Sequence, residues 1–425
     1  MAILADWKAL TRAQRNTFTA CFMGWTLDAF DFFLLTLCLG SIAKDFRVGL
    51  PAIADAIFWT LVMRPVGAAL FGAMAERFGR RPTLMVNVIS FSIFELASAF
   101  APGLRSFLVC RALFGIAMGG EWGVGAALAL ETLPAQGRGF FSGLLQEGYV
   151  VGNLLAAALY WLLFPHLHGT GWMTPWRVMF MIGALPAVLA FYLRFSVAES
   201  PAWLAARQAG APAAGAKPRR SAYEWSKLRQ YLPSFLFLVV MMTAFTAFSH
   251  GTQDLYPTFL ERDKGLAGGT SGMLVVIASL GALCGGITCG TLSERFGRKR
   301  TIVCASLLAL PMIPLWAYSH TVAMLGLGAF LMQFAVQGAW GVVPAYLNEL
   351  SPGPVRAIFP GLAYQVGNLL TSRNGKLQTL LARRYPGGLR TVLAGTVVIV
   401  ALLLALVTSF GKERGGAELT GSGGV

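Results

Sequence analysis

Charged side chains are scarce in this sequence. Only 12% of the 425 residues are Asp, Glu, Lys or Arg, whereas 56% are hydrophobic, and the mean hydropathy is +0.62. An average soluble domain carries about 25% charged residues. A surface this poor in charge excludes a disordered chain, a collagen-like fibre and an ordinary soluble enzyme. The composition indicates an integral membrane protein.

Acidic residues, histidine and cysteine are scarce too. The chain has 34 Lys and Arg but 19 Asp and Glu, and its net charge is +15. Basic loops that face an anionic cytoplasmic leaflet explain this excess, and no basic face with interleaved aromatics suggests nucleic acid. With four histidines and no C-x-x-C pair, we expect no disulfide framework, no metal site and no cofactor. The six cysteines, which we expect to be buried apolar side chains, are Cys21, Cys38, Cys110, Cys284, Cys289 and Cys304.

Long apolar stretches dominate what is present. A helix needs about 20 apolar residues to cross a bilayer, and the sequence predicts twelve such spans in an all-α membrane protein. They are 16–40, 51–75, 82–102, 104–130, 138–164, 176–196, 232–258, 269–292, 301–319, 321–347, 357–382 and 391–410. The first span is too long and too acidic for a cleaved signal peptide.

Basic residues predict the orientation. Most Lys and Arg outside the spans fall on one face if the N-terminus is inside, so we expect a multi-pass protein of an inner or plasma membrane with both termini cytoplasmic. A group of basic residues in the last external loop has no explanation in this scheme. It consists of Arg373, Lys376, Arg383, Arg384 and Arg390.

The sequence contains an internal duplication. GAMAERFGRRPT begins at Gly72, and GTLSERFGRKRT begins 218 residues later, at Gly290. The same offset aligns Trp122 with Trp340, Glu131 with Glu349 and Arg138 with Arg356. Six spans per repeat give both halves the same orientation, as in two bundles that rock about a central site. The predicted units are an N-terminal bundle (1–197), a linker (198–230), a C-terminal bundle (231–410) and a tail (411–425).

The duplicated loop G-x-x-x-[DE]-R-x-G-[RK]-[RK] resembles the signature of the major facilitator superfamily. RALFGIAMGG, from Arg111, and AESPAW, from Ala198, are similar to further motifs of that superfamily. The resemblance implies the major facilitator fold and alternating access. We expect the Glu76 and Glu294 networks to lock the outward-facing state, while charges that only set topology remain the alternative. The predicted gating residues are Gly72, Glu76, Arg77, Gly79, Arg80, Arg138, Glu294, Arg295, Gly297, Arg298 and Arg356.

Ionisable residues inside the spans are the candidates for chemistry, because each costs about 2.5–3.5 kcal/mol at the membrane centre. All but His250 and Asp254 lie in the first half, which predicts that the N-terminal bundle handles protons. Lipid or interface exposure remains open for Glu95, and Arg111 is expected to organise the N-terminal bundle or to help proton transfer. The predicted proton-coupling residues are Asp28, Asp31, Glu121, His250 and Asp254.

Span 7 is the most informative segment and reads FSHGTQDLYPT from Phe248. His250 and Asp254 are four residues apart, so their side chains can meet on a regular helix, and Pro257 predicts a helix break. The segment resembles the motif N-x-x-[ST]-H-x-[ST]-Q-D-x-x-x-T of the fungal Jen-type lactate/pyruvate permeases, in the sialate:proton symporter family. Thr246 stands where that family has Asn. The matching residues are Ser249, His250, Thr252, Gln253, Asp254 and Thr258.

WTLDAFDF in span 1, MRPVGA in span 2 and YQVGN in span 11 are similar to segments of the same family. The resemblance implies that polar residues of spans 2, 7 and 11 bind monocarboxylates. An intramembrane Arg64 also suits a carboxylate through a bidentate pair. Structural ion pairs or interhelical hydrogen bonds remain alternatives for these residues. The predicted substrate-binding residues are Arg64, Tyr149, His250, Gln253, Asp254, Gln365 and Asn368.

The sequence therefore predicts a proton-coupled symporter of small organic anions, most simply of lactate or pyruvate, acting as a monomer in a lipid bilayer. A sialate or aromatic-acid proton symporter is the alternative among transporters, and a non-transporting membrane sensor is the alternative from another class. An enzyme is not expected, because adjacent Ser249 and His250 point in different directions on a helix.

Overall fold

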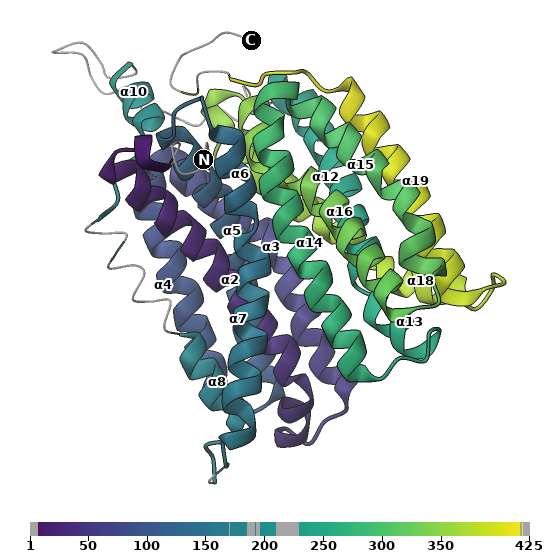
Figure 1. Cartoon of the computed structure of the whole chain (residues 1–425). Coiled ribbons are helices and arrows are strands. Elements are labelled where there is room, and N and C mark those ends of the chain that lie inside the picture. Colours follow the sequence, from purple (N-terminus) through teal and green to yellow (C-terminus); the bar gives the residue numbers. More distant parts are fainter. Residues whose placement is uncertain are drawn as a thin grey trace.

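The computed structural model describes residues 7–169, 171–184, 192, 196–209, 229–416 and 419. The N-terminal bundle consists of α2 (Arg12–Asp45), α3 (Leu50–Phe78), α4 (Arg80–Ala99), α5 (Leu104–Thr132), α6 (Arg138–Gln146), α7 (Gly148–Leu163), η1 (Phe164–His166) and α8 (Pro175–Gly183). Next come α10 (Pro201–Ala209) and η2 (Arg229–Tyr231). The C-terminal bundle consists of α12 (Leu232–Gln253), α13 (Tyr256–Arg262), α14 (Gly268–Phe296), α15 (Arg298–Ile313), η3 (Pro314–Tyr318), α16 (Val322–Leu350), η4 (Gly353–Val355), α17 (Phe359–Thr371), α18 (Asn374–Ala382) and α19 (Gly388–Phe410). The two bundles stand side by side (Figure 1).

Ten helices within the described residues are long and apolar enough to cross a membrane. They match ten of the twelve predicted spans. Of the predicted span 176–196, the structure describes α8, while residues 185–191 and 193–195 lie outside the described part. The predicted span 357–382 is divided into α17 and α18 next to Arg373. The linker residues 210–228 and the tail residues 417, 418 and 420–425 also lie outside the described part.

Two of the predicted spans contain breaks that place side chains. Span 5 is divided at Glu147, which separates α6 from α7. Span 7 is divided at Asp254 and Leu255, between α12 and α13. Pro257 is the second residue of α13, where the missing N–H of a proline costs no helical hydrogen bond. The predicted break therefore lies just before this proline.

One end of the molecule carries the start of α2, the end of α19 and α10, and we call it the α10 end (Figure 1). Here the duplicated motif turns the chain from α3 into α4 and from α14 into α15. Gly79 and Gly297 make these turns with φ of 106° and 89°, values that only glycine adopts without strain. The repeat therefore reproduces the backbone of both loops.

Small residues bring helices close within each bundle. A Cβ on Gly67 of α3 would meet the carbonyl of Ile116 in α5, and a Cβ on Gly285 of α14 would meet that of Phe334 in α16. These contacts are equivalent under the 218-residue repeat. The expectation that all cysteines are buried was wrong, because Cys284 and Cys304 are exposed on helices that cross the membrane, where the apolar thiols can face lipid.

Candidate functional site

Arg64 lies in the middle of α3 and is 4% exposed. Its Nε donates to the sulfur of Met118 at 3.2 Å, and its guanidinium lies 5.1 Å from the centre of the Phe32 ring. No carboxylate among the described residues forms an ion pair with it, and Asp28 is the carboxylate that interacts with its charge at longer range. Arg64 is therefore a buried cation without a fixed anionic partner in the described structure.

Side chains from both bundles lie within electrostatic range of this cation. The charge of Arg64 acts on Tyr149 of α7, on Tyr364 of α17 and on His250 of α12. Tyr149 also interacts with Asp254. Residues predicted to bind the substrate from spans 2, 5 and 7 therefore lie close together, between the two bundles.

His250 and Asp254 form the polar pair that their spacing predicts. His250 Nδ1 lies 3.2 Å from Asp254 Oδ1, and the two side chains are 37% and 44% exposed. Asn368 of α17 adds a side-chain hydrogen bond to His250, and its Nδ2 donates to Gln365 Oε1 at 3.2 Å. This chain of groups joins α12 to α17 and leaves part of the His250–Asp254 pair accessible.

Gln253 takes a different direction from its neighbours. Its Nε2 donates to Gln333 Oε1 of α16 at 2.8 Å, and Gln333 in turn donates to Thr252 Oγ1 at 3.3 Å. The structure thus places this side chain in a contact within the C-terminal bundle. A role for Gln253 in substrate binding stays a prediction.

Aromatic rings cover the site and come from both bundles. Tyr364 contacts Trp122 and Trp340, with ring centroids 4.9 Å and 5.5 Å away, and Tyr149 stacks on Trp25 at 5.6 Å. Trp122 and Trp340 are equivalent under the repeat, so this alignment was the available signal. Sequence reasoning did not assign Trp25, Trp122, Trp340 or Tyr364 to the site.

Three of the predicted proton-coupling acids are buried in the N-terminal bundle. Asp28, Asp31 and Glu121 are at most 1% exposed, and none of their carboxylate oxygens has a hydrogen-bond partner among the described residues. Burying an ionised carboxylate without a partner is very costly. These positions therefore favour the neutral, protonated form of each acid in this conformation.

Glu95 and Arg111 form a separate buried pair. Arg111 Nη2 donates to Glu95 Oε2 at 2.7 Å, and Arg111 Nε donates to Ser98 Oγ at 3.0 Å. The Phe114 ring lies 4.4 Å from the guanidinium. Glu95 is fully buried, so it does not face lipid, and Arg111 connects α4 with α5 within its own bundle.

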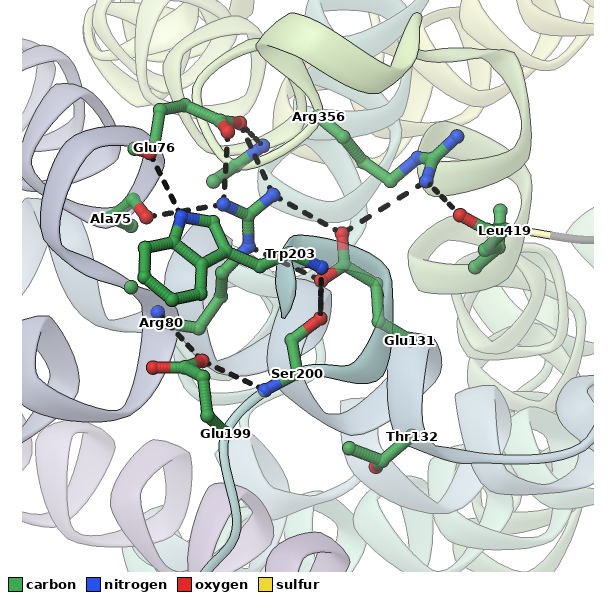
Figure 2. Close-up of polar contacts among 12 residues, drawn as sticks. Ala75, Glu76, Arg80, Glu131, Thr132, Glu199, Ser200, Trp203, Arg356 and Leu419 are labelled. Carbon is green, nitrogen blue, oxygen red and sulfur yellow. Dashed lines mark hydrogen bonds and ion pairs between the residues drawn. The ribbon is translucent and has the colours of Figure 1, made fainter. Parts of the chain in front are cut away.

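A network of ion pairs lies at the α10 end of the N-terminal bundle (Figure 2). Arg80 Nη1 donates to Glu76 at 2.9 Å, and Arg80 Nε donates to Glu131 at 3.2 Å. Glu131 also accepts from the hydroxyl of Ser200, and the indole of Trp203 donates to the Glu76 carbonyl at 2.9 Å. The network ties α3, α4 and α5 to α10 and the segment before it.

The C-terminal bundle repeats this network. Arg298 Nη1 donates to Glu294 at 3.0 Å, and Arg298 Nη2 donates to Glu349 at 3.1 Å. In the first network Glu199 accepts from the backbone N–H of Arg80 at 2.9 Å, and in the second Glu413 accepts from that of Arg298 at 3.0 Å. Sequence reasoning missed Glu413, because its position does not follow the 218-residue offset.

Each network also reaches the opposite bundle. Glu76 accepts a hydrogen bond from the backbone N–H of Ala357 at 2.8 Å, and Glu294 accepts one from that of Gly139. Two arginines add crossing ion pairs. Arg138 Nη1 lies 3.5 Å from Glu349, and Arg356 Nη1 lies 4.0 Å from Glu131 (Figure 2).

Glycines make these crossings possible. A Cβ on Gly72 would meet Ala357 and Ile358 of the other bundle, and a Cβ on Gly290 would meet Gly139 and Gly143. The predicted gating residues Arg77 and Arg295 are placed differently. Arg77 lies 5.1 Å from the Phe78 ring, and Arg295 is exposed. The bundles are thus joined at the α10 end by two equivalent sets of contacts.

Residues 21–372 match the sequence profile of the Major Facilitator Superfamily, which covers more than half of the chain. The chain belongs to this superfamily. Its members are membrane transporters and not enzymes. The chain is 29% identical over 398 residues to a carboxylic acid transporter protein homolog of Saccharomyces cerevisiae, with 90% of this chain and 64% of that protein covered. It thus spans less than two thirds of the length of the yeast protein.

A second relative is the sialic acid transporter NanX of Escherichia coli, which is 28% identical over 409 residues, with 95% of this chain and 96% of NanX covered. Among solved structures, the proton:xylose symporter XylE bound to 6-bromo-6-deoxy-D-glucose superposes with a TM-score of 0.72 at 20% identity. The superposition covers 96% of this chain and 98% of XylE. This likeness shows the major facilitator fold.

Proposed function

We propose that the protein is a proton-coupled symporter of small monocarboxylates such as lactate or pyruvate. The observation that carries the proposal is Arg64, a buried cation with no ion pair to a carboxylate among the described residues. A permanently charged guanidinium inside a membrane protein needs an anion. A substrate carboxylate meets that need with two parallel hydrogen bonds, which are stronger than those of neutral groups.

The surrounding groups suit a small, polar anion. Tyr149, the accessible His250–Asp254 pair and the amides of Gln365 and Asn368 can hydrogen-bond the carbonyl or hydroxyl of such a substrate. The name of the yeast relative, a carboxylic acid transporter homolog, supports the same substrate class. The name of NanX keeps sialate as the second candidate.

Proton coupling is supported by the unpaired buried acids of the N-terminal bundle. Asp28 is the one whose charge interacts with that of Arg64. An ionised Asp28 would compete with the substrate carboxylate for the charge of Arg64, so the anion binds when Asp28 holds its proton. Substrate and proton therefore bind together. On this mechanism the acid and the anion share one buried positive charge.

The two crossing networks also indicate which side of the protein is closed. We take the α10 end as cytoplasmic, in agreement with the basic loops there. The contacts of Glu76 with Ala357 and of Glu294 with Gly139 then hold the cytoplasmic side closed, as in an outward-facing or occluded state. Alternating access requires these contacts to break when the substrate is released inside. The protein functions as a monomer on this proposal.

The test is uptake of radiolabelled lactate, pyruvate, acetate and sialate into proteoliposomes with an imposed pH gradient. We expect lactate or pyruvate to accumulate when the outside is acidic, and accumulation to stop when a protonophore removes the gradient. Lactate uptake that ignores the gradient would exclude symport. Accumulation of sialate alone would replace the substrate class, and no uptake of any of the four acids would contradict the proposal.

A further inference from the structure

Glu147 is a buried acid that the proposed mechanism does not use. It lies between α6 and α7, it is 1% exposed, and both carboxylate oxygens lack a hydrogen-bond partner within the described structure. Its backbone is fully paired, because its N–H donates to Gly143 and its carbonyl accepts from Val151. Within the described structure, only the carboxyl group of this residue therefore lacks hydrogen-bond partners.

The carboxyl group lies against the other bundle. A Cβ on Gly286 of α14 would fall on the Glu147 carboxylate. The same face of α6 packs on α14 through glycines, since a Cβ on Gly143 would meet the Gly286 carbonyl and a Cβ on Gly139 would meet that of Gly290. We call this contact of Gly139, Gly143 and Glu147 with Gly286 and Gly290 the α6–α14 seam.

No charge from the described residues compensates the carboxyl group in the seam. The titratable side chains on the elements packed against α6 and α7 include Cys21 and Asp28 on α2, Glu121 on α5, Arg138 on α6, Tyr149 on α7, Cys284 and Cys289 on α14, and Tyr346 on α16. None of these side chains interacts electrostatically with Glu147. Burial is the main influence on the ionisation of its carboxyl group. Arg138, the nearest cation along its own helix, is paired with Glu349.

We propose that Glu147 is a proton-binding site of the conformational cycle, protonated while the α6–α14 seam is closed and ionised when the seam opens. An unpaired carboxylate in a dry contact is far costlier than a protonated acid. When α6 and α14 separate, water reaches the group, and the proton leaves to solvent. Because the closed seam binds the proton more tightly, proton binding must in turn favour the closed seam.

Glu147 differs from the other unpaired acids in the bundle that its carboxyl group contacts. Asp31 lies against Gly183 and Glu121 lies against Gly24, both within the N-terminal bundle. Glu147 touches the C-terminal bundle, so its environment changes when the bundles move apart. The inference rests on the proposed alternating access but needs no particular substrate.

The experiment measures seam closure directly. Spin labels are attached to cysteines introduced as Gln136→Cys and Arg300→Cys, two exposed positions at the α10 end of different bundles, after the six native cysteines are replaced. Distance distributions from pulsed electron spin resonance, recorded across a pH series in detergent or nanodiscs without substrate, give the ratio of open to closed molecules.

We expect the open-to-closed ratio to rise with pH in the unmutated chain, with about a tenfold change per pH unit for each linked proton. Glu147→Gln, which keeps the shape of the protonated acid, should lower the ratio and remove one proton from this dependence. Glu261→Gln on the exposed surface of α13 is the matched control and should leave the dependence unchanged. A Glu147→Gln slope equal to that of the unmutated chain would overturn the inference.

A second variant covers the case in which Glu147→Gln does not fold. Gly286→Ala places a methyl group where the carboxylate lies, so it should raise the open fraction at every pH. An unchanged distance distribution would contradict the seam contact. Failure of symport itself is distinguishable, because it appears as absent gradient-driven uptake in the unmutated chain and does not affect this substrate-free measurement.

Discussion

The α10 end and the membrane centre retain the internal duplication to different degrees. At the α10 end Glu76, Arg80 and Glu131 have the counterparts Glu294, Arg298 and Glu349, and both sets make the same contacts. At the centre the counterparts of Arg64 and Glu121 are Ala282 and Ala339.

The Glu95–Arg111 pair of the N-terminal bundle also has no charged counterpart in the C-terminal bundle. Its repeat equivalents are Ile313 and Ala329. The duplicated contacts hold two similar bundles together, so the same ion pairs are needed in each bundle. A single binding site between the bundles needs each charged group once, since each further intramembrane charge is costly. On the proposed function, the α10 end serves motion and the centre serves recognition.

The largest effect is expected at the unduplicated cation. Arg64→Ala should lower kcat/KM for uptake about 30-fold to several thousand-fold, because truncating one partner of a buried charge pair costs about 2–5 kcal/mol. The kcat/KM of Arg64→Lys should lie between those of Arg64→Ala and the unmutated chain, because lysine keeps the charge but loses the bidentate geometry. The measurement is initial uptake in proteoliposomes at several substrate concentrations.

The control for this prediction uses the duplication. Ala282→Ser changes the equivalent position in α14 and should leave uptake near that of the unmutated chain. If the Arg64→Ala variant transported as well as the Ala282→Ser variant, the unduplicated positive charge at the membrane centre would not be needed for transport. The cation would then be a structural residue.

An intermediate effect is expected at the two duplicated networks of the α10 end. Glu76→Ala and Glu294→Ala should each raise the open-to-closed ratio at the α10 end about ten- to a hundredfold, because each loses charge-assisted hydrogen bonds worth about 1.5–3 kcal/mol. The Gln136 and Arg300 spin-label pair measures this shift. Equal effects of the two variants would support equivalent roles for the two networks, and an effect of one variant alone would contradict that equivalence.

Glu199→Ala is the matched control for these two variants. Glu199 accepts from the backbone N–H groups of Arg80, Arg81 and Ser200, so it holds the start of α4 through contacts within its own bundle. We expect Glu199→Ala to lower the thermal stability of the protein and to leave the open fraction unchanged. An open fraction raised as far as in Glu76→Ala would show that local disorder, and not the crossing bond, controls opening.

The repeat predicted which residues are equivalent but not which ones meet. Alignment pairs Glu76 with Glu294, whereas the structure bonds Glu76 to Ala357 and Glu294 to Gly139. These partners lie on the opposite bundle, and a sequence repeat carries no information on how two bundles face each other. The gating role of these residues remains a proposal.

The centre was predictable where local spacing decides. The four-residue spacing of His250 and Asp254 predicted their contact, which the structure has at 3.2 Å. Helical periodicity says which residues share a face but not what that face touches. Gln253 therefore could not be placed against Gln333 from the sequence. The seam contact of Glu147 was hidden for the same reason, because it depends on a glycine in the other bundle.

The smallest effect is expected at a crossing contact that the repeat does not duplicate. Ser142 of α6 donates to the Gly341 carbonyl at 2.8 Å and accepts from the Ala345 N–H at 2.9 Å, and its repeat equivalent is Pro360. Gly341 and Ala345 are the two groups that would pair with each other in a regular helix, next to Pro344, which has no N–H.

Ser142→Ala should raise the open-to-closed ratio at the α10 end by only about fivefold, which corresponds to about 1 kcal/mol. The reason is compensation, because without the hydroxyl the Ala345 N–H can pair with the Gly341 carbonyl inside α16. Ser90→Ala, which removes a hydroxyl bonded within α4, should not change the spin-label distances. A shift as large as that of Glu76→Ala would mean that α16 cannot close this turn by itself, and that the hydroxyl from the other bundle is part of its structure.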